Sequence, residues 1–227
     1  MFFDYDYIVL VVPALIIALF AQIRVKSTFN KYSHVSNQRQ YTGSMVARKI
    51  LDANGLSNIR LERVAGELSD HYDPRAGVIR LSDSTFNSTS VGAIGVAAHE
   101  VGHAIQHQVG YLPIKIRNAI IPVTQLGSSL AFPIALIGLI MGFDLLVQAG
   151  IFLFCAVVAF QLITLPVEFN ASRRAMATLE NDHILEDDEL RGARKVLSAA
   201  AMTYVAALIV AVANLLRLLA LQNRNRR

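Results

Sequence analysis

Four long apolar segments dominate the hydrophobic pattern of the chain. They cover about residues 5–23, 119–143, 145–167 and 199–221. Each approaches or exceeds the roughly 20 residues that a helix needs to cross about 30 Å of hydrocarbon. Only Asp144 separates the second segment from the third, which predicts a tight transmembrane hairpin. The pattern therefore predicts a mainly α membrane protein with about four transmembrane helices.

The stretch between the first two apolar segments has the pattern of a small α+β unit. Residues 42–56 carry apolar side chains at helical spacing and reach a helix stop at Asn54-Gly55. Residues 59–64 and 77–82 alternate as half-buried strands do, and DPRAG (residues 73–77) predicts a turn between them. A further helix is expected over residues 91–108, capped by Ser88, Thr89 or Ser90.

Composition supports a membrane protein and excludes some other classes. The 227 residues are 54% hydrophobic and 17% charged, whereas soluble domains carry about 25% charged residues. A single cysteine, Cys155, rules out an intramolecular disulfide. The net charge of +4 comes from dispersed cations without the aromatic interleaving of single-strand binders, so we expect no nucleic-acid partner.

Cations beside the apolar segments predict the orientation in a cell membrane. The flanking residues are Arg24, Lys26, Lys31, Lys115, Arg117, Arg173 and Arg174. The positive-inside rule then places residues 24–118 and 168–198 on the cytoplasmic side of a multi-pass protein, although the tail QNRNRR opposes this. The start MFFDYD lacks the positive n-region of a signal peptide, so the first segment is expected to stay as an anchor.

The stretch AAHEVGHAIQH (residues 97–107) contains the metal-site pattern H-E-x-x-H. His99 and His103 are four residues apart, so on a helix both imidazoles face one metal site. Glu100 lies beside that site, where its carboxylate can accept a proton from a water activated by Zn²⁺. The small residues around the motif predict close packing against another helix.

A catalytic zinc requires a third protein ligand, and two residues compete for this role. His107 is near in sequence, but on an unbroken helix it lies about 12 Å from His99. Glu168 is the better candidate because it follows the third apolar segment on the same predicted side. Small residues three, four and seven positions later would allow close packing there, and one of them, Ser172, could orient a ligand.

Other parts of a peptidase site are less defined by the sequence. An oxyanion donor could be His71, His183 or Tyr204. The strand GVIRLS (residues 77–82) is either an edge strand that pairs with a peptide backbone or an ordinary strand of the sheet.

The chain resembles the YugP-like family of bacterial membrane zinc metallopeptidases. Four motifs carry this resemblance over essentially the whole chain: AAHEVGHAIQH, DHYDPRAGVIRLS, LPVEFNASRRA and AAMTYVAALI. More distantly, the H-E-x-x-H motif followed by E-F-x-A resembles the HtpX and Ste24 membrane metalloproteases, whose third ligand is a glutamate. That resemblance implies a ligand role for Glu168. Ser172 stands where those proteases have aspartate, so the equivalent contact differs here.

These observations predict an integral-membrane zinc endopeptidase with a zincin-like catalytic unit. Its substrate would be a peptide or protein at or near the membrane surface, in contact with the lipid bilayer. The expected organisation is an anchor (residues 1–23), a catalytic region (24–118), a transmembrane hairpin (119–167), a third-ligand helix with connector (168–198), and a last transmembrane helix with basic tail (199–227). The alternatives are a non-enzymatic membrane scaffold with structural zinc and a hydrolase of non-peptide amides.

Overall fold

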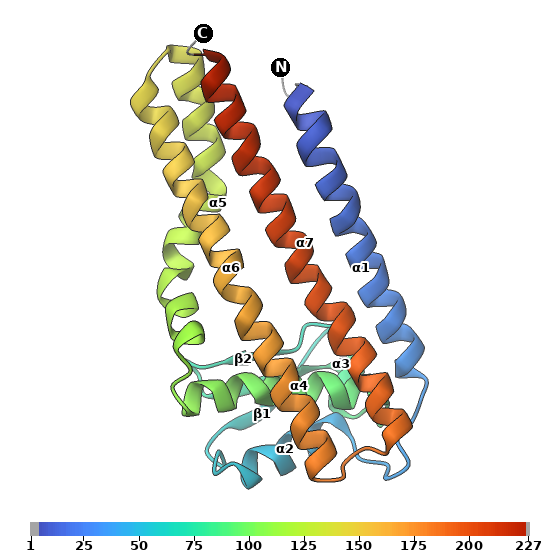
Figure 1. Ribbon diagram of the computed structural model, residues 1–227. Coiled ribbons are helices and arrows are strands. Elements are labelled where there is room, and N and C mark those ends of the chain that lie inside the picture. The colour runs from blue at the N-terminus through green and yellow to red at the C-terminus, as the bar shows by residue number, and fades with distance from the viewer. Residues whose placement is uncertain (1–4, 226–227) are drawn as a thin grey trace. The chain divides into compact units, whose positions relative to one another are not determined.

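A computed structural model describes residues 5–225 and contains four long helices (Figure 1). The first begins as a π-helix, η1 (Tyr7–Val11), and continues as α1 (Val12–Ser33). The others are α5 (Leu112–Met141), α6 (Asp144–Asn181) and α7 (Asp187–Asn225). Within this part of the chain, four helices are long and apolar enough to cross a membrane, which confirms the predicted number. The first four residues of the predicted anchor and the last two arginines of the tail lie outside the described residues.

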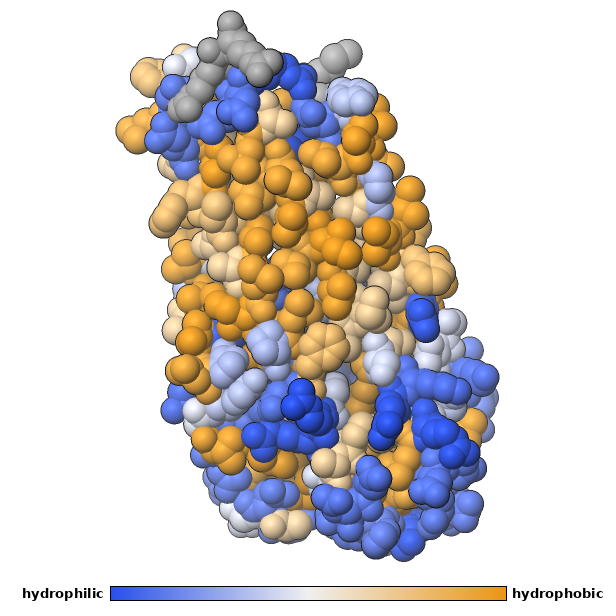
Figure 2. Space-filling model, viewed as in Figure 1, coloured by the Kyte–Doolittle hydropathy of each residue, from blue (hydrophilic) through white to orange (hydrophobic). Residues whose placement is uncertain are grey.

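The chain forms two compact units. Unit 1 comprises residues 1–22, 112–166 and 202–227, and unit 2 comprises residues 23–111 and 167–201. The long helices of unit 1 present a largely hydrophobic surface, as expected for lipid contact, and hydrophilic residues are frequent on unit 2 (Figure 2). The H-E-x-x-H motif and Glu168 both lie in unit 2.

Small residues allow the helices of unit 1 to pack closely. A Cβ atom added at Gly150 would lie 2.6 Å from the Ala131 carbonyl oxygen, so α6 and α5 are in backbone contact there. Gly142, with φ +70°, ends α5 two residues before α6 begins and makes the predicted tight hairpin. Arg217 of α7 is buried with its guanidinium over the rings of Tyr7 and Phe132.

Unit 2 contains three shorter helices, and two of them begin at hydroxyl caps. The Thr42 side chain accepts a hydrogen bond from the Met45 amide and starts α2 (Gly43–Ala53), which ends at Asn54 as predicted. The Ser90 side chain accepts from Ala93 and starts α4 (Val91–Gln108), which has the predicted bounds. The third helix is the short α3 (Asp83–Phe86).

A three-stranded sheet accompanies these helices, in the order β1-β3-β2. Its strands are β1 (Arg60–Val64), β2 (His71–Asp73) and β3 (Val78–Ser82). β3 pairs in parallel with β1 and antiparallel with β2. The alternative that GVIRLS forms an edge strand is wrong, because β3 pairs with β1 on one side and with β2 on the other. The short strand β2 was not predicted from the sequence. The predicted turn is present and joins β2 to β3, with Gly77 at φ +61°.

The buried core of unit 2 brings α4 against α2, the sheet, and the parts of α6 and α7 that belong to this unit. Its fully buried side chains include Ile50 and Leu51 of α2, Ile79 of β3, Val101 of α4 and Leu179 of α6. These residues occupy the apolar face of each element, so burial of that face holds α4 in the middle of the unit.

The backbones of α4 and α6 come into direct contact at Gly102. A Cβ atom at this position would lie 2.7 Å from the carbonyl oxygen of Ala171. No real side chain fits at that distance, so this crossing requires a glycine on α4. The small residues around the motif therefore pack against another helix, as the sequence predicted.

Replacement of Gly102 by alanine is expected to lower the thermal stability of the protein. Overpacking typically costs about 1–3 kcal/mol, which exceeds or cancels the gain of about 1 kcal/mol from the better helix former. Gly95→Ala on the same helix is the control, because its Cβ would come no closer than 3.3 Å to any atom of its neighbour Ala193. Melting temperatures of both variants in detergent test this, and a Gly102→Ala protein at least as stable as Gly95→Ala would contradict it.

Candidate metal centre

Two histidines lie one helical turn apart on α4 and face the same direction. The ring centroids of His99 and His103 are 4.7 Å apart, with the rings nearly perpendicular. Both side chains are largely buried. This is the arrangement that the four-residue spacing dictates on a regular helix, and Ser90 fixes the start of that helix.

The carboxylate of Glu168, on α6, lies close to both imidazoles of α4. Its Oε2 lies 3.3 Å from His99 Nε2 and 3.6 Å from His103 Nε2. The carboxylate is only 3% exposed. Glu168 precedes Ala171 by one turn on α6, so the backbone contact at Gly102 brings the carboxylate to the histidine pair.

The chemistry and spacing of these donors fit a zinc ion. Two imidazole nitrogens and one carboxylate oxygen form a common catalytic zinc set, and in a tetrahedral site with bonds of about 2.0–2.1 Å two ligand atoms lie about 3.3–3.4 Å apart. The separation of 3.3 Å equals this value and that of 3.6 Å is slightly longer. Among the described residues, His99, His103 and Glu168 form a group that could hold a metal ion, with all ligand atoms within 4.8 Å of one another.

Hydrogen bonds to the outer ring nitrogens orient both histidines. His99 Nδ1 lies 3.1 Å from the Ser172 hydroxyl oxygen. His103 Nδ1 lies 3.0 Å from Gln106 Oε1. Contacts of this kind leave Nε2 of each ring for the ion and hold the ring plane in place. The serine that replaces the aspartate of the HtpX-type proteases therefore still contacts a histidine here.

Glu100 is buried and its negative charge acts on the site. Burial alone disfavours the imidazolium form of His103, but the close contact with the Glu168 carboxylate and the charges of Glu100 and Glu168 raise the pKa of His103 above its usual value. A proton therefore stays on this ring at a higher pH than on an ordinary histidine. Because a ligand imidazole must be deprotonated, protons would compete with a metal ion for His103, and acidification would weaken its binding.

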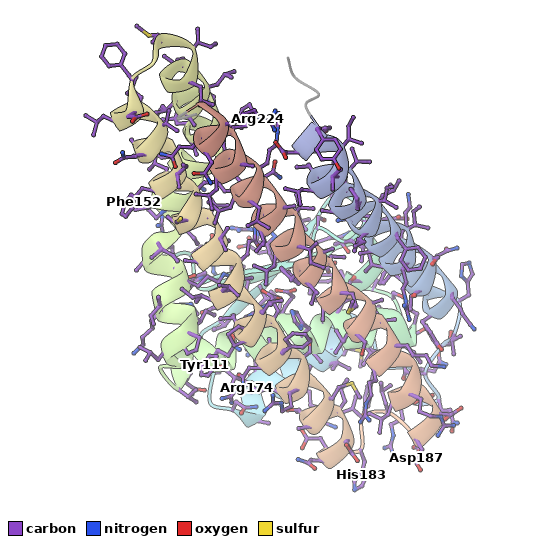
Figure 3. All side chains as sticks on the ribbon, turned by 45° about the horizontal axis from the view of Figure 1, so that its top comes forward. Tyr111, Phe152, Arg174, His183, Asp187 and Arg224 are labelled. Carbon is purple, nitrogen blue, oxygen red and sulfur yellow. The ribbon has the colours of Figure 1, made fainter. Side chains whose placement is uncertain are left out.

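Several candidate residues from the sequence lie outside the three-residue group. His107 packs edge-on against Tyr72 of β2, with ring centroids 5.6 Å apart. His71 is exposed on β2, where its ring contacts the Ser69 carbonyl and Arg80. His183 lies in the turn between α6 and α7 (Figure 3), and Tyr204 belongs to unit 1.

Gln106 is the site residue that the sequence reasoning missed. It is fully buried although it is polar, and besides His103 it contacts α6. A signal was present in the spacing, because positions 99, 103 and 106 follow the i, i+4, i+7 pattern of one helix face. The partners of Gln106 on α6 could not be read from that pattern.

Comparisons with known proteins give a family match and a similar bacterial relative. Residues 7–223 match the family model described as "Putative neutral zinc metallopeptidase". The chain is 48% identical over 211 residues to the "Putative membrane protease YugP" of Bacillus subtilis (strain 168), covering 93% of this chain and 94% of the relative. No solved structure matches. With a zinc-compatible donor group, four helices able to span a membrane and a match over nearly its whole length, the chain belongs to this family of neutral zinc metallopeptidases.

Proposed function

We propose that this protein is an integral-membrane zinc endopeptidase whose ion is held by His99, His103 and Glu168. The observation that carries the proposal is the position of Glu168. Its carboxylate lies at zinc-ligand spacing from both imidazoles, and the next residue after His99 on α4 is a glutamate. A structural zinc site has no use for such a base, whereas a hydrolytic site requires one.

The bound zinc would supply a Lewis acid and lower the pKa of a coordinated water from about 15.7 to about 7. Glu100 would accept a proton from the water molecule that attacks the carbonyl carbon of the peptide bond. As the C–N bond breaks, Glu100 donates that proton to the leaving amine and returns to its carboxylate form. The burial of Glu100 limits its contact with bulk water and keeps the proton between reactants.

The outer strand β2 would hold an extended peptide substrate. β2 pairs with β3 on one side, and its other side is an outer edge of the sheet among the described residues. Tyr72 of β2 packs against His107, one turn beyond His103 on α4. A peptide added to this edge would satisfy the strand's backbone groups and run beside the helix that carries the histidines.

The zinc content of purified protein tests the ligand set. We expect about one zinc per chain in the wild type and a large loss in Glu168→Ala and His99→Ala, because two ligands bind zinc more weakly than three. Glu180→Ala, which removes an exposed glutamate from the same helix, serves as the control. Elemental analysis gives the measurement, and unchanged zinc in Glu168→Ala would place the third ligand elsewhere.

Glu100→Gln is expected to retain zinc but to lose about 10²- to 10⁴-fold in hydrolysis, because the amide cannot accept the proton. The assay follows cleavage of a quenched-fluorescent unstructured protein, with Glu67→Gln as a control at an exposed position. Wild-type turnover should stop with a chelator and return with zinc. Full activity in Glu100→Gln would refute the mechanism, and a zinc-loaded wild type that cleaves no peptide would favour the scaffold alternative.

We also propose that the metal centre faces the cytoplasm, on the basis of the cations beside the apolar segments. In a Cys155→Ala background, a cysteine at Ala76 in the β2–β3 turn should react with an impermeant maleimide only after spheroplasts are opened. A cysteine at Phe143 in the α5–α6 turn should react in intact spheroplasts, because one membrane crossing separates it from the cytoplasmic flank. The reverse labelling pattern would show the opposite orientation.

A further inference from the structure

The amide of Gln106 can adopt only one orientation in its surroundings. Its Nε2 lies 2.8 Å from the Val167 carbonyl oxygen and 2.9 Å from Asn170 Oδ1. A backbone carbonyl accepts hydrogen bonds and never donates them. If the amide were turned over, its oxygen would face the Val167 carbonyl oxygen. Both buried acceptors would then lack a donor, and each would carry its full desolvation penalty. The nitrogen of Gln106 therefore faces α6 and the oxygen faces α4.

Arg174 fixes the second of these acceptors. Its Nε donates to Asn170 Oδ1 at 2.9 Å, one turn along α6 (Figure 3 labels Arg174). A guanidinium has only donors and does not lose its proton in proteins. Asn170 must therefore present its oxygen, which also accepts from Gln106. Two independent acceptors on α6, one from the backbone and one held by a permanent cation, thus set the direction of the Gln106 amide.

The protonation of His103 follows from that direction. Gln106 Oε1 lies 3.0 Å from His103 Nδ1 and can only accept, so Nδ1 must carry the hydrogen. In the neutral ring, Nε2 then bears the lone pair, and this is the atom that lies 3.6 Å from Glu168 Oε2. The other histidine is not constrained in this way, because its partner is the Ser172 hydroxyl, which can donate or accept.

We infer that Gln106 is a positioning residue that holds His103 in its Nδ1–H tautomer, with Asn170 and Arg174 holding Gln106 in turn. The inference rests on the proposed function only in taking His103 as a zinc ligand. A fixed tautomer keeps the lone pair directed at the ion and removes the cost of selecting it when zinc binds. Gln106 also hydrogen-bonds to α6, the helix that carries Glu168. The same side chain therefore orients the His103 ring and helps to fix the distance between His103 and Glu168.

The test is the tautomer of His103 in metal-free protein, measured by ¹⁵N NMR of histidine-labelled samples at a pH where the imidazoles are neutral. His103→Gln assigns the signals by their loss. We expect a protonated Nδ1 and an unprotonated Nε2 in the wild type, and a mixture of tautomers in Gln106→Met. Gln108→Met on the same helix, whose amide contacts Asn54, is the matched control and should keep the wild-type spectrum.

Zinc affinity by chelator competition provides the second measurement. Loss of an outer-shell partner typically weakens metal binding by about 10- to 100-fold, so we expect a drop in this range for Gln106→Met and none for Gln108→Met. A wild-type His103 with unprotonated Nδ1 would overturn the inference without any variant, even if Gln106→Met failed to fold. A wild type that binds no zinc would refute the proposed function, but the metal-free tautomer would still decide this inference.

Discussion

The metal centre depends on the backbone contact between α4 and α6 at Gly102 and Ala171. Packed helices usually lie 8–10 Å apart, a distance set by the side chains between them. At this crossing the backbones approach closely, and Glu168 lies one turn before the contact on α6, facing the two imidazoles. Burial of its apolar residues in the core of unit 2 holds α4 against α6. The absence of a side chain at Gly102 permits the close backbone contact between the two helices. The 3.3 Å between Glu168 and His99 is a result of this crossing.

The same contact buries the negatively charged carboxylate of Glu168 beside two imidazoles. A buried carboxylate is costly unless it is paired or coordinates a metal, and Glu168 is 3% exposed. With the lone pair of His103 turned toward Glu168, two acceptors face each other across the site. Only a positive species between them, a proton or a metal ion, satisfies both. An ion that binds the folded form alone also stabilises it by mass action, so assembly of the site and stability of unit 2 are linked.

Features set by short sequence patterns were predictable, and those set by distant contacts were not. The bounds of α4 follow from a capping serine and a helical pattern, and the hydropathy of the long segments gives the four membrane helices. Glu168 could be selected because it follows an apolar segment on the predicted side of the motif. In contrast, β2 has three residues, too few for a recognisable alternation, and it forms because β3 offers a partner. The spacing places Gln106 on the face of α4 that carries the histidines, but the direction of its amide depends on Val167 and on the Asn170–Arg174 pair of α6.

The position of Glu168 along the chain has a consequence for biogenesis. In the proposed site the two histidines are synthesised first, and the glutamate follows only after α5 and the apolar part of α6 have left the ribosome. A nascent chain that has emerged only as far as α4 carries two of the three ligands and lacks the helix that completes the site. Hydrolytic competence would thus be withheld until the hairpin has been inserted. In this way the order of translation would delay hydrolysis until the transmembrane hairpin that precedes Glu168 has been synthesised.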